Sequence, residues 1–200
     1  MVGVDLQGSL LGSGGPGIDA GFAGLTRLHL DHETWVDHVP GWLSGSDAMF
    51  SWLLEHAPFG QMDIVLYGER KTSPRLVARL PVGSLPPALA DGRAALSARY
   101  RVDFESVGVN LYRNGRDSVA WHGDRLARTK PTAVVATLSV GERRRFLLRP
   151  RAGGRRSEAF DPGQGDLLVM GGACQRTWQH SVPKVASAGP RMSVTFRHAY

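Results

Sequence analysis

The chain has 200 residues, of which 42% are hydrophobic and 21% charged, so it is long enough to fold as one domain with its own core. Its formal net charge of +6 indicates an anionic partner, although an arginine-rich soluble protein of any kind fits that charge equally well. Its single cysteine, Cys174, excludes an intramolecular disulfide, and no run approaches the roughly 18 apolar residues of a membrane span, so we expect a cytoplasmic protein with no membrane partner.

The N-terminal half of the chain mixes strand and helix patterns. Glycine-rich residues 1–24 are expected to form a flexible leader, and residues 25–200 a single domain. Residues 26–36 alternate apolar and polar side chains, as a strand does. Ser46 can cap a helix with an apolar stripe, and a second helix follows Pro86 and Pro87. The stretches predicted between these helices are a strand at 62–67, a polar connection at 68–74 and a strand at 76–80.

Beyond residue 101 the sequence is dominated by short strand patterns with glycine- or proline-rich turns between them. The predicted strands are 107–113, 133–140, 145–149, 166–170, 177–182 and 192–197. Many short strands at short intervals favour a double-sheet jelly roll. We therefore predict an α+β, mainly β fold, with a double-stranded β-helix (jelly-roll) core braced by the N-terminal helices.

A histidine and a carboxylate stand two positions apart in His122-Gly-Asp124, and this spacing sends both side chains to one face of an extended chain. A distant second histidine would complete a 2-His-1-carboxylate triad, which leaves half of the coordination sphere of Fe(II) open. We select His180, which lies in a strand-like run that ends before Pro183. A competing His-x-Asp, His29 with Asp31, lies in a short segment crowded by other polar residues and is less favourable.

Eleven residues after His180 begins the segment Arg191-Met-Ser-Val-Thr-Phe-Arg197. In a strand, Arg191, Ser193, Thr195 and Arg197 face one way while the three apolar residues face a hydrophobic layer. Two inward-facing cations need an anion, and a small dicarboxylate bound to the metal supplies one. The alternative is that these arginines face solvent on an edge strand.

These residues together resemble the AlkB family of Fe(II)- and 2-oxoglutarate-dependent dioxygenases. The resemblance covers about residues 40–197 and rests on Asn110-x-Tyr112, His122-x-Asp124, His180 and the Arg191-x-x-x-Thr195-x-Arg197 strand. It implies that His122, Asp124 and His180 hold Fe(II), and that Asn110, Tyr112, Arg191 and Arg197 bind 2-oxoglutarate. It also implies that O2 is consumed while an N-methyl group on a nucleobase of the 1-methyladenine or 3-methylcytosine type leaves as formaldehyde.

Two positions depart from the family pattern. Ser193 stands where an asparagine is expected, and Arg125 stands where repair members have an acid that reads the exocyclic amine of the base. An arginine cannot accept a hydrogen bond from an amine, so the base preference is open. Trp121, Arg125 and Trp178 are candidate substrate contacts, although tryptophans beside metal ligands are more often core residues.

Residues 143–156 contain seven arginines and no acidic residue. Further cations lie near the proposed iron ligands in sequence, namely Arg113, Arg116, Arg125, Arg128 and Lys130. They predict a phosphate-binding surface for alkylated DNA or RNA, single-stranded or with a flipped base, and a set of solvated turns is the plainer alternative. We expect a monomer. The same oxygenase chemistry on a protein side chain or small molecule, and an inactive nucleic-acid-binding module with this fold, remain alternative functions.

Overall fold

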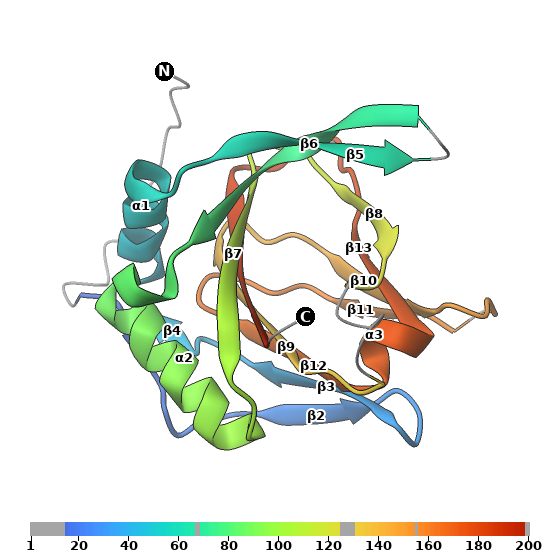
Figure 1. Ribbon diagram of the computed structural model, residues 1–200, viewed down its shortest axis with the longest axis horizontal. Coiled ribbons are helices and arrows are strands. Elements are labelled where there is room, and N and C mark those ends of the chain that lie inside the picture. The colour runs from blue at the N-terminus through green and yellow to red at the C-terminus, as the bar shows by residue number, and fades with distance from the viewer. Residues whose placement is uncertain (1–14, 67–68, 125–130, 155, 199–200) are drawn as a thin grey trace.

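The computed structural model describes residues 15–66, 69–124, 131–154 and 156–198, which form two antiparallel β-sheets and the helices that cover one of them (Figure 1). The larger sheet contains, in spatial order, β2 (Thr26–His29), β3 (Thr34–Val39), β12 (Leu167–Gly172), β9 (Val135–Gly141), β14 (Arg191–His198), β7 (Phe104–Tyr112), β6 (Glu69–Leu80) and β5 (Gly60–Leu66). The smaller sheet contains β11 (Glu158–Phe160), β10 (Phe146–Pro150), β13 (Trp178–Val182) and β8 (Val119–His122). A short pair, β1 (Gly17–Ile18) with β4 (Leu43–Ser44), lies beside them.

Side chains of the larger sheet alternate between two environments. On β14, Met192, Val194 and Phe196 belong to an apolar cluster shared with the helices, while Arg191 and Arg197 line a cavity on the opposite face. This is the alternation predicted from the sequence, and it follows from the two-residue period of a strand. One face of the sheet is therefore a hydrophobic layer, and the other carries polar groups toward the smaller sheet.

The helices cover the outer face of the larger sheet. Helix α1 (Ser46–His56) begins after Gly45, whose φ of 62° is left-handed, so Ser46 is the first helical residue and not the cap that we predicted. Helix α2 (Pro87–Tyr100) begins with proline at its first position, as predicted. Both helices bury apolar residues in the same cluster as β7, β9 and β14. The remaining helical turns are η1 (Val82–Ser84) and α3 (Cys174–Thr177).

A second apolar cluster fills part of the space between the two sheets. Val135 and Met170 of the larger sheet pack there with Leu148 and Trp178 of the smaller one. Cys174 is buried in this cluster at the start of α3, shortly after β12 ends. Val135 and Met170 of this cluster also line the cavity described below, so the cluster and the cavity adjoin between the sheets.

Three local features differ from what the sequence indicated. The polar connection predicted at 68–74 is mostly strand, because β6 already begins at Glu69. The strand β8 was not predicted, because its four residues are too short to show an alternation. The leader expected to end at residue 24 is packed from Gly17 onward, since β1 pairs with β4 and Phe22 is buried in the helix-side cluster. Within the described ranges, no helix is both long and apolar enough to cross a membrane.

Candidate active site

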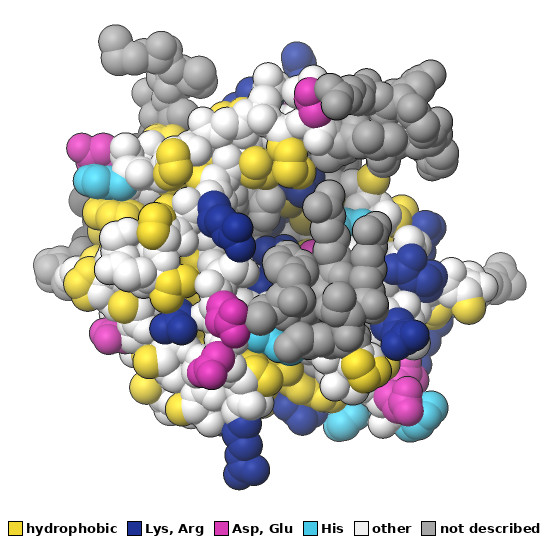
Figure 2. Space-filling model, in the orientation of Figure 1, with side chains coloured by type: hydrophobic (Ala, Val, Ile, Leu, Met, Phe, Trp, Pro, Cys, Tyr) yellow, Lys and Arg dark blue, Asp and Glu magenta, His cyan; other side chains and the backbone are white. Residues whose placement is uncertain are grey.

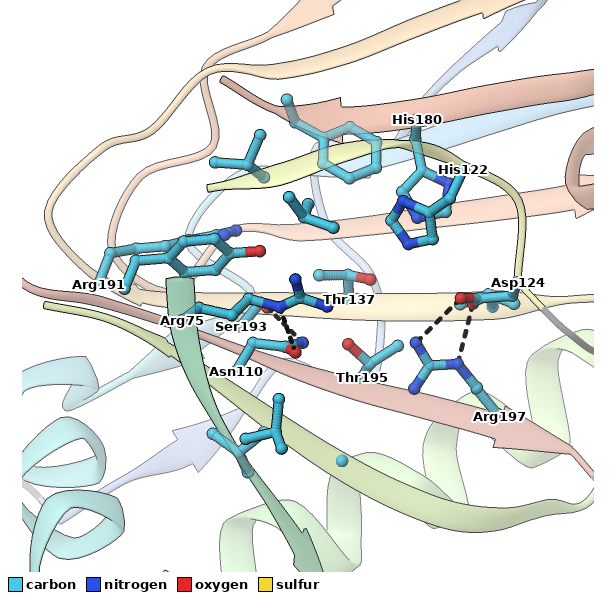
Figure 3. A pocket seen from close by; sticks show the side chains of 18 of the residues that line it. Arg75, Asn110, His122, Asp124, Thr137, His180, Arg191, Ser193, Thr195 and Arg197 are labelled. Atoms are coloured by element: carbon cyan, nitrogen blue, oxygen red, sulfur yellow. Dashed lines mark hydrogen bonds and ion pairs between the residues drawn. The ribbon is translucent and has the colours of Figure 1, made fainter. Parts of the chain in front are cut away.

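A cavity of about 510 Å³ lies between the two sheets and collects most of the residues singled out from the sequence (Figure 3). Strands β6, β7, β9 and β14 supply one wall, and β8, β10 and β13 supply the other. The labelled polar residues in Figure 3 are Arg75, Asn110, His122, Asp124, Thr137, His180, Arg191, Ser193, Thr195 and Arg197. Polar groups from segments far apart in sequence thus converge in one cavity.

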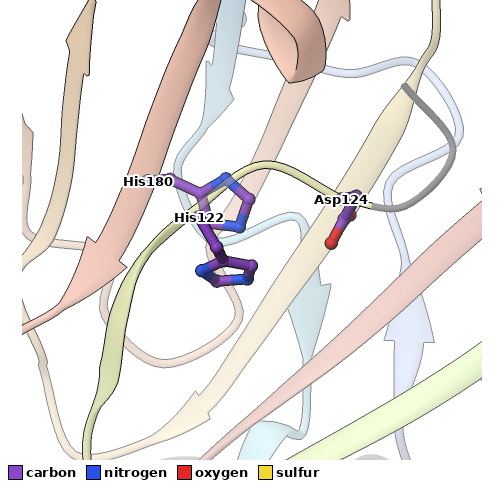
Figure 4. A group of neighbouring side chains, drawn as sticks. All are labelled: His122, Asp124 and His180. Carbon is purple, nitrogen blue, oxygen red and sulfur yellow. The ribbon is translucent and has the colours of Figure 1, made fainter. Parts of the chain in front are cut away.

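His122, Asp124 and His180 each offer one ligand atom, and these atoms lie within 4.8 Å of one another (Figure 4). The two histidines sit directly opposite each other on paired strands β8 and β13, with ring centroids 4.2 Å apart. The pairing shifts register between His180 and Val182, so that both Val119 and His122 line the cavity although they are three residues apart. This irregularity aims His122 at the carboxylate that follows it.

Both imidazoles favour the neutral form, in which one ring nitrogen keeps its lone pair. Burial lowers the pKa of His122 and lowers that of His180 to about 3. The Nδ1 atom of His122 lies 2.8 Å from the carbonyl oxygen of Ala120, which can only accept a hydrogen bond, so Nδ1 carries the proton. The Nε2 lone pair of His122 is consequently available to a metal ion.

Asp124 is held as an anion by Arg197. The guanidinium donates from Nε to one carboxylate oxygen at 2.9 Å and from Nη2 to the other at 3.2 Å. Burial alone would raise the pKa of Asp124, but the charges and hydrogen bonds around it, led by Arg197, lower it to about 2. The backbone N–H of Asp124 donates to the side chain of Gln175 in α3, which fixes the residue from a second direction.

Arg191 is a fully buried cation at the far end of the cavity. It is 1% exposed, its Nη2 donates to Ser139 at 2.8 Å, and its Nε has no hydrogen-bond partner in the described structure. Burial lowers its pKa, and its guanidinium lies 5.2 Å from the ring centroid of Tyr112. A buried, incompletely paired cation is costly, so this end of the cavity is suited to an anionic group.

Asn110 and Arg75 form a second polar pair near Arg191. Asn110 accepts a hydrogen bond from Arg75 Nε at 2.9 Å and donates one to Ser193 at 3.2 Å. Ser193 stands where the family pattern has a longer asparagine, and its shorter side chain still contacts Asn110. Arg75 was not among the predicted site residues. It lies between the polar connection predicted at 68–74 and the strand predicted at 76–80, and a lone arginine there has no local pattern that distinguishes it from a surface residue.

The donor set fits the group that the sequence suggested. Two neutral imidazoles and one carboxylate in a single cluster are the donors of a ferrous 2-His-1-carboxylate centre. Arg191, whose Nε has no hydrogen-bond partner in the described structure, lines the same cavity. The distal carboxylate of a metal-bound dicarboxylate would reach toward it. The residues present therefore fit both an iron ion and 2-oxoglutarate.

Comparison with known proteins identifies the family. Residues 50–197 match the model of the 2OG-Fe(II) oxygenase superfamily. The chain belongs to this superfamily. Its fold agrees with that assignment, since it superposes on the structure of OsALKBH1 with a TM-score of 0.61 over 87% of this chain and 100% of the other, at 16% identity. A Trichoplax adhaerens prolyl hydroxylase bound to a peptide of hypoxia inducible factor gives 0.60 over 82% of each chain, at 12% identity.

Within the superfamily the chain is similar to AlkB homologues. It is 32% identical over 182 residues to alpha-ketoglutarate-dependent dioxygenase alkB homolog 3 of Bos taurus, covering 79% of this chain and 63% of the relative. It is 30% identical over 189 residues to the DNA oxidative demethylase ALKBH2 of Arabidopsis thaliana, covering 74% of this chain and 60% of the relative. The chain thus spans somewhat less than two thirds of the length of these curated relatives.

The two tryptophans predicted as substrate contacts do not line the cavity. Trp178 is 3% exposed in the core between the sheets, where its Nε1 donates to Asp31 at 2.8 Å. Trp121 is half-buried beneath the guanidinium of Arg149, 4.2 Å from the ring centroid, and does not line the cavity. Arg125 lies outside the described residues. The competing pair of His29 and Asp31 forms no metal cluster in the described ranges, and Asp31 instead fixes Trp178.

The arginine-rich segment divides into structural and exposed members. Arg144 is 2% exposed and donates to the backbone carbonyls of Asn114, Asp117 and Pro183, so it stabilises the fold, and its prediction as a phosphate contact was wrong.

Arg149 and Arg151 are exposed. Figure 2 shows Lys and Arg side chains on the side of the molecule where β10 and β13 lie in Figure 1. Arg128, Lys130 and Arg155 lie outside the described residues.

Proposed function

We propose that this chain is an Fe(II)- and 2-oxoglutarate-dependent dioxygenase that oxidatively demethylates N-alkylated nucleobases in DNA or RNA, of the 1-methyladenine and 3-methylcytosine type. The observation that carries the proposal is one cavity that holds a 2-His-1-carboxylate cluster together with a buried arginine. The similarity to a relative named as a DNA oxidative demethylase supports the substrate class.

His122, Asp124 and His180 would hold Fe(II), which supplies the O2-dependent oxidation when bound. Overall, the methylated base, 2-oxoglutarate and O2 become the unmethylated base, formaldehyde, succinate and CO2, and a proton is released when the methylated base is a cation. The chain's contribution is to bind and orient these reactants. Neutral His122 and His180 offer lone pairs without first losing a proton, and anionic Asp124 offsets part of the metal's charge.

The cosubstrate contacts follow from the charges at the other end of the cavity. Arg191 would form a salt bridge with the distal carboxylate of 2-oxoglutarate, and Tyr112 and Asn110 line the path toward the metal ligands. Arg197 was expected to contact the cosubstrate too, but in the structure it is bound to Asp124. We propose that its main role is to orient that ligand.

Alkylated nucleic acid would reach the cavity as a single strand or as a flipped base, because a base stacked in a duplex cannot approach a buried metal site. Exposed Arg149 and Arg151 lie on the outer face near β8 and would contact phosphates. We further propose a monomer in the cytoplasm, where the buried Cys174 stays reduced.

Formaldehyde release tests the proposal. The protein, supplied with Fe(II), 2-oxoglutarate and O2, should release formaldehyde from a single-stranded oligonucleotide that carries 1-methyladenine or 3-methylcytosine, and none from the unmethylated strand. If 2-oxoglutarate is consumed but no methylated nucleic acid yields formaldehyde, a protein side chain or a small molecule becomes the substrate. If anaerobic Fe(II) binding is the same in the wild type and in His122→Ala, the inactive binding module is the better account.

A further inference from the structure

The outer face of the smaller sheet carries an aromatic ring covered by a guanidinium. Trp121 precedes His122 on β8, and because neighbouring residues of a strand point to opposite faces, Trp121 faces outward while His122 lines the cavity. The guanidinium of Arg149, on β10, lies over the Trp121 ring at 4.2 Å from its centroid. Gln179, on β13 between these two strands, contacts the same guanidinium. These three residues, Trp121, Arg149 and Gln179, are called the outer stack below.

Two neighbours hold the Arg149 side chain in one orientation. Arg149 and Gln179 stand directly opposite each other on paired strands, so their side chains share one face of the sheet. Arg149 donates to Oε1 of Gln179 from Nε at 3.4 Å and from Nη2 at 3.2 Å. The Trp121 ring covers one face of the guanidinium. The plane of the guanidinium is therefore oriented before any ligand binds, which lowers the entropic cost of binding.

The charge of Arg149 has no carboxylate beside it. Strands β8, β10 and β13 contain no acidic residue, and within the described ranges Arg149 forms no ion pair. Other exposed arginines of the same segment do form one. Arg145 pairs with Asp161 at 3.5 Å. Arg156 pairs with Glu158 at 3.1 Å. Arg149 is exposed although an aromatic ring covers one face of its guanidinium, so the opposite face is available to a planar ligand.

The outer stack lies beside the rim of the cavity. In the described structure β8 is the edge strand of the smaller sheet (Figure 1). His122 and Gly123 line the cavity and are both partly exposed, so the cavity opens along this edge. Arg151 reaches the same rim, since its Nη2 atom lies 2.8 Å from the place of a Cβ on Gly123. A strand whose methylated base enters the cavity can therefore turn around β8 and bring a neighbouring nucleotide to the outer face.

A nucleobase is the planar ligand that fits this surface. Guanidinium planes stack on bases, and such stacking accepts any base because every base has a π face. The Nη1 group of Arg149 has no hydrogen-bond partner in the described part of the chain, so it can donate to a phosphate of the same strand. The plane and the charge of one arginine thus serve two different contacts with a nucleic acid.

Resting on the demethylase function, we propose that the outer stack binds the base of a nucleotide that neighbours the methylated one. The base lies on the exposed face of the Arg149 guanidinium, the Trp121 ring supports the other face, and Gln179 orients the plane. The strand is then held on both sides of β8, which keeps the methylated base in the cavity.

Abasic nucleotides separate stacking from phosphate binding, because they remove a base and keep the charge of the backbone. Each oligonucleotide carries one 1-methyladenine, and the two nucleotides on its 5′ side, on its 3′ side or on neither side are abasic. Affinity for the protein loaded with Fe(II) and 2-oxoglutarate is measured by fluorescence anisotropy without O2. For the wild type, abasic nucleotides on at least one side should weaken binding about tenfold relative to the intact strand.

Arg149→Lys is the deciding variant, because lysine keeps the positive charge and lacks the plane. The loss of affinity caused by the abasic nucleotides should shrink to about twofold or less. The slope of log affinity against log salt should stay at its wild-type value, because the charge is kept. Arg99→Lys is the matched control and should keep the wild-type loss, since Arg99 is an exposed arginine over the ring of Phe22 on the helix side.

Trp121→Leu is a second variant, which removes the support of the guanidinium and should also shrink the loss of affinity. A melting temperature that still rises with 2-oxoglutarate and Mn(II) shows that this variant folds and binds cosubstrate. If it fails that control, the comparison of Arg149→Lys with the wild type decides alone.

Failure of the outer stack is distinguishable from failure of the demethylase proposal. An equal loss of affinity in the wild type and in Arg149→Lys, or no loss in the wild type on either side, would overturn the outer stack. The strand would still bind, so the demethylase proposal would stand. Absence of binding to every methylated strand, with 2-oxoglutarate still consumed, would reject a nucleic-acid substrate and the outer stack together.

Discussion

At the scale of single residues, the site depends on how Asp124 is held. Arg197 bonds to both of its carboxylate oxygens, and Gln175 accepts from its backbone N–H, so its orientation is set before any ligand arrives. Partners of this kind, one step removed from the metal, usually change metal affinity when they are removed. We therefore propose that Arg197 supports iron binding by orienting Asp124, a role that its position on β14 alone did not indicate.

Arg197→Met should weaken Fe(II) binding about 10- to 100-fold, because Asp124 loses the group that orients it and lowers its pKa. Anaerobic calorimetric titration with Fe(II) measures this, with Arg99→Met on the exposed face of α2 as a charge-matched control. Unchanged Fe(II) affinity with a loss of 2-oxoglutarate affinity would instead support the cosubstrate role inferred from the sequence.

The pH dependence of stability should report the buried His180. Its folded pKa of about 3 lies below the value of about 6.5 for an unfolded histidine, so stability is full above pH 6.5 and falls as pH decreases toward 3. In metal-free His180→Asn, the slope of unfolding free energy between pH 6 and pH 4 should be smaller by up to about 1.4 kcal/mol per pH unit. Denaturant unfolding measures it. An equal effect of His32→Asn, whose side chain is 88% exposed, would contradict this account.

Residue types and spacing could predict that His122, Asp124 and His180 come together. They could also predict the inward face of β14, because a two-residue period fixes which side chains share a face. They could not predict that Arg75 enters the cavity or that Arg144 is buried, because both are arginines in stretches without a periodic pattern. Nor could they predict that Arg197 binds Asp124, since that contact joins residues 73 positions apart. Such contacts depend on how the sheets meet, which local sequence does not encode.

At the scale of elements, the chain at Gly123, directly after β8, packs closely against α3. A Cβ added to Gly123 would lie 2.4 Å from the carbonyl oxygen of Gln175 and 2.8 Å from Nη2 of Arg151. The glycine thus allows the chain between the two ligands His122 and Asp124 to pass directly over α3. Sequence reasoning predicted His122 and Asp124 as ligands but did not predict β8, whose role becomes visible when its pairing with β13 is known.

Gly123→Ala should cost about 1–3 kcal/mol of stability and weaken Fe(II) binding, because either Asp124 or α3 must move to make room. Thermal unfolding and anaerobic Fe(II) titration measure the two effects. Gly60→Ala is the control, since a Cβ there meets no atom within 4 Å. If Gly123→Ala binds Fe(II) as tightly as Gly60→Ala does, the close packing of this loop does not position the ligands.

At the scale of the whole molecule, the larger sheet separates two tasks. Its outer face packs against α1 and α2 and supplies a core, while its inner face carries the polar cavity. The smaller sheet carries both histidines inside and exposed arginines outside, so a nucleic acid bound to its outer face would lie beside the metal ligands. The jelly-roll architecture was predictable from many short strands, whereas the placement of the helices over one face depends on long-range packing.

Binding to single-stranded DNA should depend steeply on salt if Arg149 and Arg151 contact phosphates. Replacing both with alanine should weaken affinity and reduce the slope of log affinity against log salt by about 0.7 for each lost contact. Fluorescence anisotropy across a salt series measures the slope, and Arg99→Ala on α2 should leave it unchanged. A double variant with the wild-type slope would place the nucleic-acid surface elsewhere.

The most direct test of the central claim is 2-oxoglutarate turnover with and without a methylated single strand. The wild type supplied with Fe(II) and O2 should consume 2-oxoglutarate faster when the strand is present, with formaldehyde formed alongside succinate, and His122→Ala should lose both activities. Turnover that is absent in the wild type, or that persists unchanged in His122→Ala, would contradict the assignment of this cavity as an oxygenase active site.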